Sequence, residues 1–447
     1  MVLQQKMNVP IWGWASPGEK VNVTASWSRN ITLKTLAGPD GKWMVKLKTP
    51  RAGGPYDMVV KGNTTKLLHG ILIGEVWICS GQSNMEMPVG GWDNTPINNS
   101  KEEIAAANYP DIRLFTVSKK IAIEPEQDVS GSWASSTPGS VSKFSATAYF
   151  FGRALGKKLG VPVGLIHTSW GGTVAEAWTS AGALHKLGDF DNELKKLDSI
   201  KPHLPELVLK EKEENILWNK ALTNKNSEYA QVNFDDKEWK KMNLPGAWEN
   251  SGYPDLDGIV WFRKLIEIPA SWSGKKLKLD LGPVDDYDVT YFNGDEIGST
   301  TKEGSWNLNR NYEIPAKLVH AGPNLITIKV TDLGGGGGLT GDQKLLKLYL
   351  DESSNEESLA LAGEWSFNIE AVKPNYVDKN PNVPSVLYNG MIAPLIPYAI
   401  KGAIWYQGEA NVGRATQYEK LFPAMIADWR SKWKQGPFPF YFVQIAP

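Results

Sequence analysis

Apolar residues recur at every second position in the first part of the chain, at 21–25 and again at 43–47. This period of two is typical of strands with one buried face. Clusters of Gly, Pro, Ser and Asp separate the runs, for example at 16–18 and 38–41. Several short strands at such spacing predict a small β-sandwich over residues 1–72.

The pattern then changes to short apolar runs, at 71–79, 161–168 and 404–406, each followed by small polar residues or Gly. Residues 148–159 carry apolar side chains at helical spacing and end at a Gly. Buried strands that alternate with helices predict an α/β fold with parallel strands.

A second β-rich stretch interrupts this α/β pattern. Apolar residues alternate with polar ones at 277–281, and Asn293-Gly294 is the strongest short hairpin signal that a sequence offers. The Gly run 334–338 lacks the Gly-Lys-Ser/Thr ending of a phosphate loop, so we expect a flexible loop at a sandwich edge.

These patterns divide the chain into four expected segments. Residues 1–72 form the N-terminal sandwich, 73–218 the first part of the α/β domain, 219–375 an inserted β-sandwich, and 376–447 the second part of the α/β domain. A chain of 447 residues is long enough for two or three domains.

Composition narrows the class of protein. The formal net charge of −1 gives no reason to expect a nucleic-acid or anionic-membrane partner, and no apolar run is long enough to span a membrane. The single cysteine, Cys79, excludes an internal disulfide and a cysteine-based zinc site. With 19 Trp and 15 Tyr, the chain is rich in the side chains of β cores and of carbohydrate-facing surfaces.

The candidate nucleophile follows the run 71–79. Ser80-Gly81-Gln82 leads to Ser83 at the predicted C-terminal end of a strand, which is where open α/β sheets place their ligands. A hydroxyl at such a turn, with a Gly nearby that allows close backbone approach, is placed as a nucleophile. An isolated string of this kind is more often only a turn, so the interpretation depends on motifs elsewhere.

Three strings together carry a resemblance: CSGQSNM at 79–85, SWGG at 169–172 and WYQGEAN at 405–411. They resemble the motif blocks of the SGNH (GDSL-like) hydrolases, in the version carried by the sialate O-acetylesterases and related carbohydrate acetylesterases. The resemblance implies an SGNH catalytic domain, flavodoxin-like and three-layered. It also implies a serine esterase that removes O-acetyl groups from carbohydrates, most of all from sialic acid, with no metal and no organic cofactor.

Carried over residue by residue, the resemblance makes Ser83 the nucleophile and assigns the oxyanion hole to the backbone N–H of Gly172 and the side-chain amide of Gln407. The implied supporting residues are Gln82, Asn84, Gly171, Glu409 and Asn411. We expect Glu409 and Asn411 to brace the loop and one another.

The expected insertion carries a resemblance of its own. The strings WKKMNLPGAW at 239–248, WFRKLIEIP at 261–269 and VTYFNGDEIG at 289–298 resemble the jelly-roll, galactose-binding-like module of glycoside hydrolase family two. Such modules are ancillary, so no chemistry is carried over from it.

The base is the missing part of the resemblance. The family places an Asp-x-x-His near its C-terminal end, after a strand like 438–445, but no His follows His320 here. We therefore expect the catalytic His and Asp to be absent from this chain and the natural protein to continue beyond Pro447. Among the five histidines, His167 is the one substitute close in sequence to the Gly pair.

Other interpretations stay open. The chain fits a carbohydrate-binding protein with an incomplete or degenerate hydrolase domain, or an acetylesterase for another glycan such as xylan. The expected partner is an O-acetylated sugar or glycan, and the oligomeric state is open. We expect a periplasmic or secreted location, although no signal peptide is visible and Met1 reads as domain interior rather than a natural start.

Overall fold

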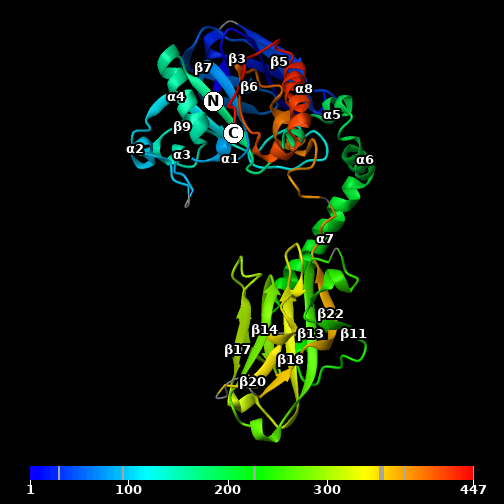
Figure 1. The fold of residues 1–447 in the computed structure, drawn as a ribbon. Helices are drawn as coiled ribbons and strands as arrows, with labels where there is room; N and C mark the ends of the chain where they lie inside the picture. The colour runs from blue at the N-terminus through cyan, green and yellow to red at the C-terminus, as the bar shows by residue number, and fades with distance from the viewer. Residues whose placement is uncertain are drawn as a thin grey trace. The chain divides into compact units, whose positions relative to one another are not determined.

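The computed structural model describes residues 1–28, 31–92, 95–224, 228–254, 256–351, 357–376 and 378–445. The chain forms two compact units (Figure 1). Unit 1 comprises Met1–His203 and Lys379–Pro447, and unit 2 comprises Leu204–Asp378. Ala446 and Pro447, the end of the expected last segment, lie outside the described residues.

Unit 1 is built on one large mixed sheet with the strand order β4-β3-β6-β7-β10-β8-β9, in which β1 and β23 also pair with β7, and β24 pairs with β23. The bounds of these strands are β1 Val2–Gln4, β3 Lys20–Ala25, β4 Thr32–Leu36, β6 Gly53–Lys61, β7 Thr65–Gly81, β8 Tyr109–Thr116, β9 Trp133–Ser136, β10 Val163–Ser169, β23 Gly402–Tyr406 and β24 Phe440–Phe442. The expected mixture of β-rich and α/β segments is therefore present.

Strand β7 joins the two kinds of structure. Its first half pairs in antiparallel fashion with β6, and its second half pairs in parallel with β10. The boundary expected between residues 72 and 73 falls inside this strand, which stays buried from Ile71 to Gly81. No turn residue interrupts the run, so one strand serves both the N-terminal sandwich and the α/β sheet.

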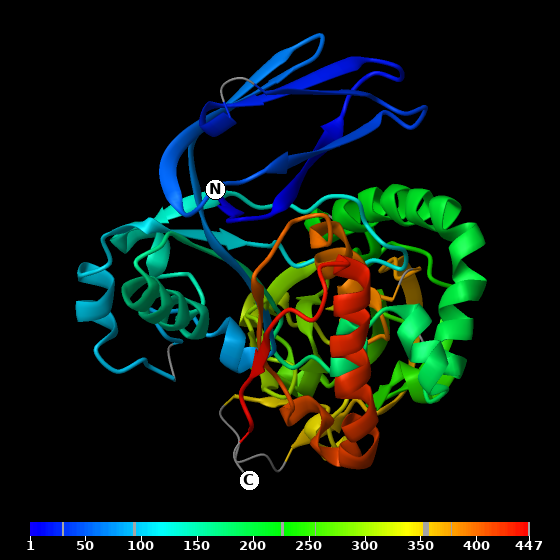
Figure 2. The same ribbon diagram turned by 90° about the horizontal axis from the view of Figure 1, so that it is seen from above.

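A two-stranded ribbon completes the N-terminal part. It consists of β2 (Asn8–Trp14) and β5 (Lys42–Lys48), paired in antiparallel fashion. Figure 2 shows the N-terminal strands together, in blue. The predicted alternation is confirmed here, because the side chains at 43, 45 and 47 are buried while those at 42, 44, 46 and 48 are exposed.

Helix α4 (Ala146–Leu159) covers one face of the α/β sheet. Ser145 caps its first turn by accepting a hydrogen bond from the Ala148 N–H, and Gly160 ends it in the left-handed conformation. Its buried residues share a core with Trp77, Cys79 and other residues of β7, β10 and β8. Burial raises the pKa of the Cys79 thiol, so this cysteine is an inert part of the core.

Helix α8 (Ala415–Trp433) packs against the opposite side of β23. Ile404 lies in the core shared with α4, whereas the next residue, Trp405, contacts Trp429 of α8 edge-on at a ring distance of 5.9 Å. Consecutive strand residues point to opposite faces, so the two helices cover different faces of the sheet. The remaining α-helices described in unit 1 are α1 Ser83–Glu86, α2 Ser100–Ala105, α3 Pro138–Val141, α5 Ala181–Leu187 and α6 Asp191–Ile200.

One predicted element of unit 1 differs from the structure: the last strand, expected over 438–445, is only β24. After the Gly pair, the chain forms a buried 3₁₀ turn, η2 (Ala175–Trp178). The Pro-containing stretch 387–400 holds a π-turn, η9 (Tyr388–Ile392), and a 3₁₀ turn, η10 (Ala393–Leu395).

Unit 2 is a β-sandwich preceded by helix α7 (Leu204–Thr223). One sheet has the order β11-β22-β13-β18-β15-β16 and the other β12-β19-β14-β20-β21, with β17 also paired to β14. The bounds are β11 Lys240–Leu244, β12 Gly246–Ala247, β13 Gly258–Ile268, β14 Leu277–Asp285, β15 Tyr287–Phe292, β16 Asp295–Thr300, β17 Asn309–Ile314, β18 Gly322–Thr331, β19 Gly338–Leu339, β20 Lys347–Leu350, β21 Ser358–Ala360 and β22 Gly363–Val372. The predicted hairpin is confirmed, because β15 turns into β16 at Asn293 and Gly294, both with positive φ.

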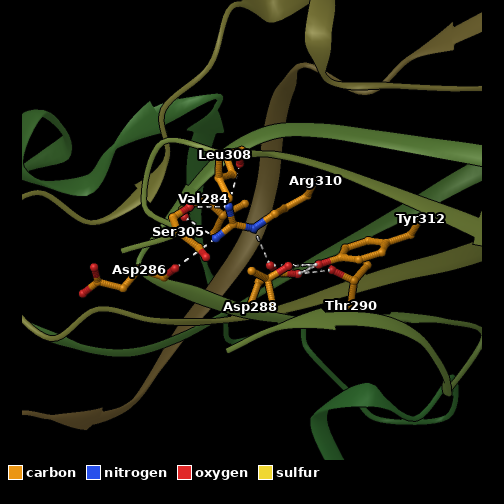
Figure 3. Close-up of polar contacts among 9 residues, drawn as sticks. Val284, Asp286, Asp288, Thr290, Ser305, Leu308, Arg310 and Tyr312 are labelled. Carbon is orange, nitrogen blue, oxygen red and sulfur yellow. Dashed lines mark hydrogen bonds and ion pairs between the residues drawn. The ribbon is translucent and has the colours of Figure 1, made fainter. Parts of the chain in front are cut away.

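A buried ion pair lies inside unit 2 (Figure 3). Arg310 Nε donates to Asp288 Oδ1 at 2.9 Å, and the side chains are 1% and 0% exposed. The other guanidinium donors reach the backbone carbonyls of Ser305, Leu308, Val284 and Asp286 at 2.6–2.9 Å. Every donor of this buried arginine therefore has an acceptor.

Candidate active site

The three motif strings converge because of strand register. Strands β10 and β23 flank β7 on its two sides, both in parallel. Ser169 at the end of β10 and Tyr406 at the end of β23 are both in register with Gly81. The carboxyl ends of the three strands therefore meet at one edge of the sheet, where α/β proteins place their sites.

Gly81 permits this convergence. A methyl group at this position would lie 2.1 Å from the Tyr406 carbonyl oxygen, so β23 approaches the turn too closely for any side chain. The Gln82 N–H then donates to the same carbonyl, at 2.9 Å. The turn that carries Ser83 is thus fixed to its neighbour strand before α1 begins.

Ser83 is the first residue of α1 and its side chain is partly exposed. Within the described part of the chain, its hydroxyl makes no hydrogen bond. A methyl group on Gly171 would lie 3.6 Å from Ser83 Cβ, so the Gly171-Gly172 turn passes directly beside the serine. Ser83 and the Gly pair are therefore together, as their motifs predict.

Gly172 has the geometry of an open backbone donor. Its φ is +74°, it is exposed, and a methyl group added to its α-carbon would meet no atom of the described residues within 4 Å, its chain neighbours apart. Its N–H has no acceptor among the described residues, whereas the Gly171 N–H donates to Glu86 Oε2 at 2.5 Å. Of the two glycines, Gly172 alone offers a free amide to a ligand in this arrangement.

Gln407 lies at the same edge but its amide is engaged. Its Nε2 donates to the Thr173 carbonyl at 3.1 Å and to Asn411 Oδ1 at 2.6 Å, while its Oε1 accepts from the Tyr418 hydroxyl at 3.0 Å. The side chain is 3% exposed. To serve an oxyanion, Gln407 would have to exchange one of these bonds, and its role as a donor stays a prediction.

The remaining motif residues join the loops to one another. Gln82 Oε1 accepts from the Gly408 and Ala410 N–H groups at 3.4 and 3.2 Å. Asn84 Nδ2 donates to Glu409 Oε1 at 2.6 Å, which ties the first motif to the third.

Asn411 ties the third motif to the second. Its Oδ1 accepts from the Ala175 N–H at 3.0 Å, and its Nδ2 donates to Glu176 Oε2 at 2.9 Å. Glu409 and Asn411 both brace the site, through these separate partners.

Glu86 and Lys119 are part of the site and were missed in the sequence. Glu86 Oε1 pairs with Lys119 Nζ at 2.6 Å, and Lys119 Nζ lies 5.0 Å from the centre of the Trp170 ring. Together with the Gly171 bond, these contacts fix the turn after β10 to α1. The signal was present: Glu86 lies three residues after Ser83, on the same face of a helical turn.

His167 lies under the site but does not contact Ser83. Its Nε2 is 2.6 Å from Ser169 Oγ, and its ring is edge-on to Phe144. Burial lowers the pKa of His167 to about 4, which makes it a weak base. His167 lies on β10 in register with Cys79 of β7, so it is part of the sheet.

The other histidines are elsewhere in the chain. His69 pairs with Asp57, His185 pairs with Asp191, His203 ends the 3₁₀ turn η3 (Lys201–His203), and His320 belongs to unit 2. No hydrogen bond joins any histidine to Ser83 within the described ranges. The described residues also contain no group of three or more His, Cys, Asp or Glu side chains suited to a metal ion, and no helix among them is long and apolar enough to cross a membrane.

This edge of an α/β sheet holds an unbonded serine hydroxyl and, in the glycine turn next to Ser83, a backbone amide without an acceptor among the described residues. It is a candidate serine-hydrolase site. No family model matches the chain. Over 205 residues it is 37% identical to the sialate O-acetylesterase of Rattus norvegicus, and over 206 residues 35% identical to that of Homo sapiens. The predicted resemblance to the sialate O-acetylesterases is thereby confirmed for the matched part of the chain.

The match is partial. It covers 42% of this chain and 37% of the rat and 38% of the human protein. Among solved structures, a carbohydrate acetylesterase from Xanthomonas citri is similar across 99% of this chain and 57% of its own, with a TM-score of 0.53 and 21% identity. At that identity the similarity concerns the fold.

Proposed function

We propose that this chain carries the acyl-transfer site of a carbohydrate O-acetylesterase, with Ser83 as nucleophile. The observation that carries the proposal is the register of β7, β10 and β23, which brings Ser83, with its unbonded hydroxyl, beside the Gly171-Gly172 turn. In that turn the Gly172 N–H has no acceptor among the described residues. The similarity to the sialate O-acetylesterases makes O-acetylated sialic acid the first substrate to test, with acetylated xylan as the alternative.

The proposed reaction is a two-step acyl transfer. The Ser83 oxygen attacks the acetyl carbonyl and loses its proton to a base, and the resulting oxyanion accepts a hydrogen bond from Gly172. Collapse breaks the bond to the sugar oxygen, which takes the proton from the base and leaves as a hydroxyl, and acetyl-Ser83 remains. Water then attacks this ester, releases acetate and restores the serine.

The other residues position this pair. Glu86 holds the Gly171 amide and Lys119, so the Gly172 amide beside it has a fixed direction. Gln407 holds the Thr173 carbonyl on the other side of the turn and is the proposed second oxyanion donor. No step is assigned to a metal or an organic cofactor.

The proton acceptor is the part of the machinery for which the described residues offer no candidate in contact with Ser83. His167 is buried, bonded to Ser169 and weakly basic. General-base catalysis contributes about 10²–10⁴-fold in rate. We therefore propose that this 447-residue chain by itself turns over only traces of substrate.

The finer architecture also belongs to the proposal. We assign unit 1 the three-layer SGNH arrangement, because α4 and α8 cover different faces of the sheet. The sandwich of unit 2, with residues 219–375, is proposed to be the jelly-roll, galactose-binding-like insertion, able to be replaced by a short linker. A periplasmic or secreted location is proposed for the protein.

Acetate release with and without imidazole tests the function. Exogenous imidazole can act as the missing base, so we expect imidazole-dependent hydrolysis of O-acetylated sialic acid or acetylated xylan by the chain. The Ser83→Ala variant measures the acetate that imidazole releases without the enzyme's nucleophile, and it should release no more than imidazole alone. Equal release by both proteins would support the carbohydrate-binding interpretation instead. Robust turnover without imidazole that is lost in His167→Ala would identify His167 as the base.

A further inference from the structure

A groove lined by three tryptophans lies on the N-terminal part of unit 1. One wall is the outer face of the β2–β5 ribbon, where Trp12 is in register with Met44 and Trp14 with Lys42. The groove has a volume of about 460 Å³, within the range of small-molecule sites. None of its lining residues belongs to the Ser83 site.

The aromatic wall is exposed and rigid. Trp14 and Met44 are each 47% exposed and Leu36 is 60% exposed, which is unusual for large apolar side chains so close together. Trp12 is held edge-on to Tyr398, with a ring distance of 6.1 Å. A methyl group on Gly13 would lie 3.0 Å from the Trp43 ring, so Trp43 packs closely against the glycine.

The opposite wall offers acceptors. Pro394 and Pro397 line it, and proline has no backbone N–H to donate. Glu126 lies beside them, with its own N–H bonded to the Asn389 carbonyl at 2.9 Å. A ligand that fits this wall must bring hydrogen-bond donors.

The charges in the groove are balanced. Glu126 pairs with Lys120 at 2.7 Å, and Lys42 pairs with Asp40 at 3.2 Å. Among the described lining residues, an anionic ligand would meet no unpaired cation, and a cationic ligand would meet no unpaired carboxylate. The groove therefore suits a neutral ligand.

We propose that this groove binds a neutral oligosaccharide, with a pyranose ring stacked on Trp14. The apolar C–H face of such a ring fits an exposed indole, and its hydroxyls both donate to Glu126 and accept from Gln127 and Lys42. A proline-rich peptide also fits flat aromatic surfaces, but it brings few donors to a wall that holds acceptors. The inference does not depend on catalysis at Ser83.

The test measures binding of xylohexaose, cellohexaose, hexagalacturonate and decaproline to the full chain by ligand-observed NMR. We expect at least one of the two neutral hexaoses to bind, and Trp14→Ala to weaken that binding at least about tenfold. Met44→Lys, a second change at an exposed position, should also weaken it, because an ammonium group replaces part of the apolar wall. Trp306→Ala is the matched control, because Trp306 is 54% exposed but belongs to unit 2.

Three results would overturn the proposal: no binding of either neutral hexaose, preferential binding of decaproline or hexagalacturonate, or equal loss in Trp14→Ala and Trp306→Ala. Imidazole-supported hydrolysis of p-nitrophenyl acetate should be unchanged in Trp14→Ala. Loss of oligosaccharide binding with intact hydrolysis would show that this groove is separate from the Ser83 site. The proposal for the groove and the proposal for Ser83 can therefore be refuted independently.

Discussion

Ser83 in unit 1 and Arg310 in unit 2 are both polar side chains surrounded by hydrogen-bonded loops or strands, but they differ in whether they are hydrogen-bonded themselves. Arg310 is buried and each of its donors has an acceptor (Figure 3). The Ser83 hydroxyl is partly exposed and has no partner among the described residues, although a whole network braces the loops around it.

The difference separates structure from function. The buried Arg310–Asp288 pair has a structural role, because removing either partner would leave the other charge buried alone, at a cost of several kcal/mol. The unbonded Ser83 hydroxyl is partly exposed and so is available to water or to a ligand, while side-chain hydrogen bonds hold the loops around it. We therefore expect changes at Arg310 to affect folding and changes around Ser83 to affect activity.

The largest expected effect on stability follows from breaking the Arg310 pair. Arg310→Ala leaves Asp288 buried without its cation and frees the backbone carbonyls that hold the loop before β17. We expect a loss of about 3–5 kcal/mol, seen as lost hydrogen-exchange protection in peptides from 284–310 of the full chain. Lys237→Ala removes an exposed pair with Asp235 and should cost about 0–1 kcal/mol. Equal losses in both variants would contradict the comparison.

Gln407→Ala tests the proposed second oxyanion donor. We expect imidazole-supported kcat to fall about 10²–10³-fold with a smaller change in KM, as for the loss of one oxyanion donor. If Gln407 only braces the Thr173 turn, the loss will be smaller and hydrogen exchange will rise in peptides containing residues 171–175.

Glu86 provides a smaller test of positioning. Glu86→Ala releases both the Gly171 amide and Lys119, and we expect a loss of about 10–100-fold in kcat because the Gly172 amide is no longer aimed. Glu86→Gln keeps an acceptor for the Gly171 N–H and should recover most of that loss. A Gln variant no better than Ala would show that the charge, rather than the bond to Gly171, is what matters.

The smallest effect concerns the pH dependence of unit 2. Burial raises the pKa of Asp332 to about 7, with the nearby Asp257, Asp286 and Asp285 carboxylates adding to the shift. The folded state therefore binds a proton more tightly than the unfolded state, and stability should fall as pH rises from about 4 to about 7. When the pH is lowered from 8 to 5, we expect the hydrogen-exchange protection of the β18 amides to increase.

Asp332→Asn removes that titration and keeps an oxygen for the Gly334 N–H. Its protection should be higher at pH 8 and nearly flat with pH. An unchanged slope in the variant would assign the dependence to other groups.

Much of this arrangement follows from sequence patterns, for identifiable reasons. Helix α4, strand β10 and the Asn293-Gly294 hairpin combine strong periodicity with clear stop signals, so they were predictable. The boundary expected at residue 72 was not, because β7 is one uninterrupted apolar strand that pairs with two kinds of neighbours.

The site divides in the same way. The convergence of three motifs could be predicted from strand ends, since parallel strands align their carboxyl ends. The engagement of the Gln407 amide could not, because Thr173, which accepts from it, lies in a segment distant in sequence. The Glu86–Lys119 pair likewise joins α1 to a loop after β8, and only the folded chain shows it.

The most direct test of the central claim is to locate the acetyl group. The chain would be treated with p-nitrophenyl acetate and digested, and the acetylated peptides identified by mass spectrometry. Because no base among the described residues is in contact with Ser83, deacylation should be slow. We therefore predict that acetyl accumulates on Ser83 in the folded chain and not in the unfolded chain. Acetylation of lysines alone, or the same labelling of Ser83 in folded and unfolded protein, would contradict the account.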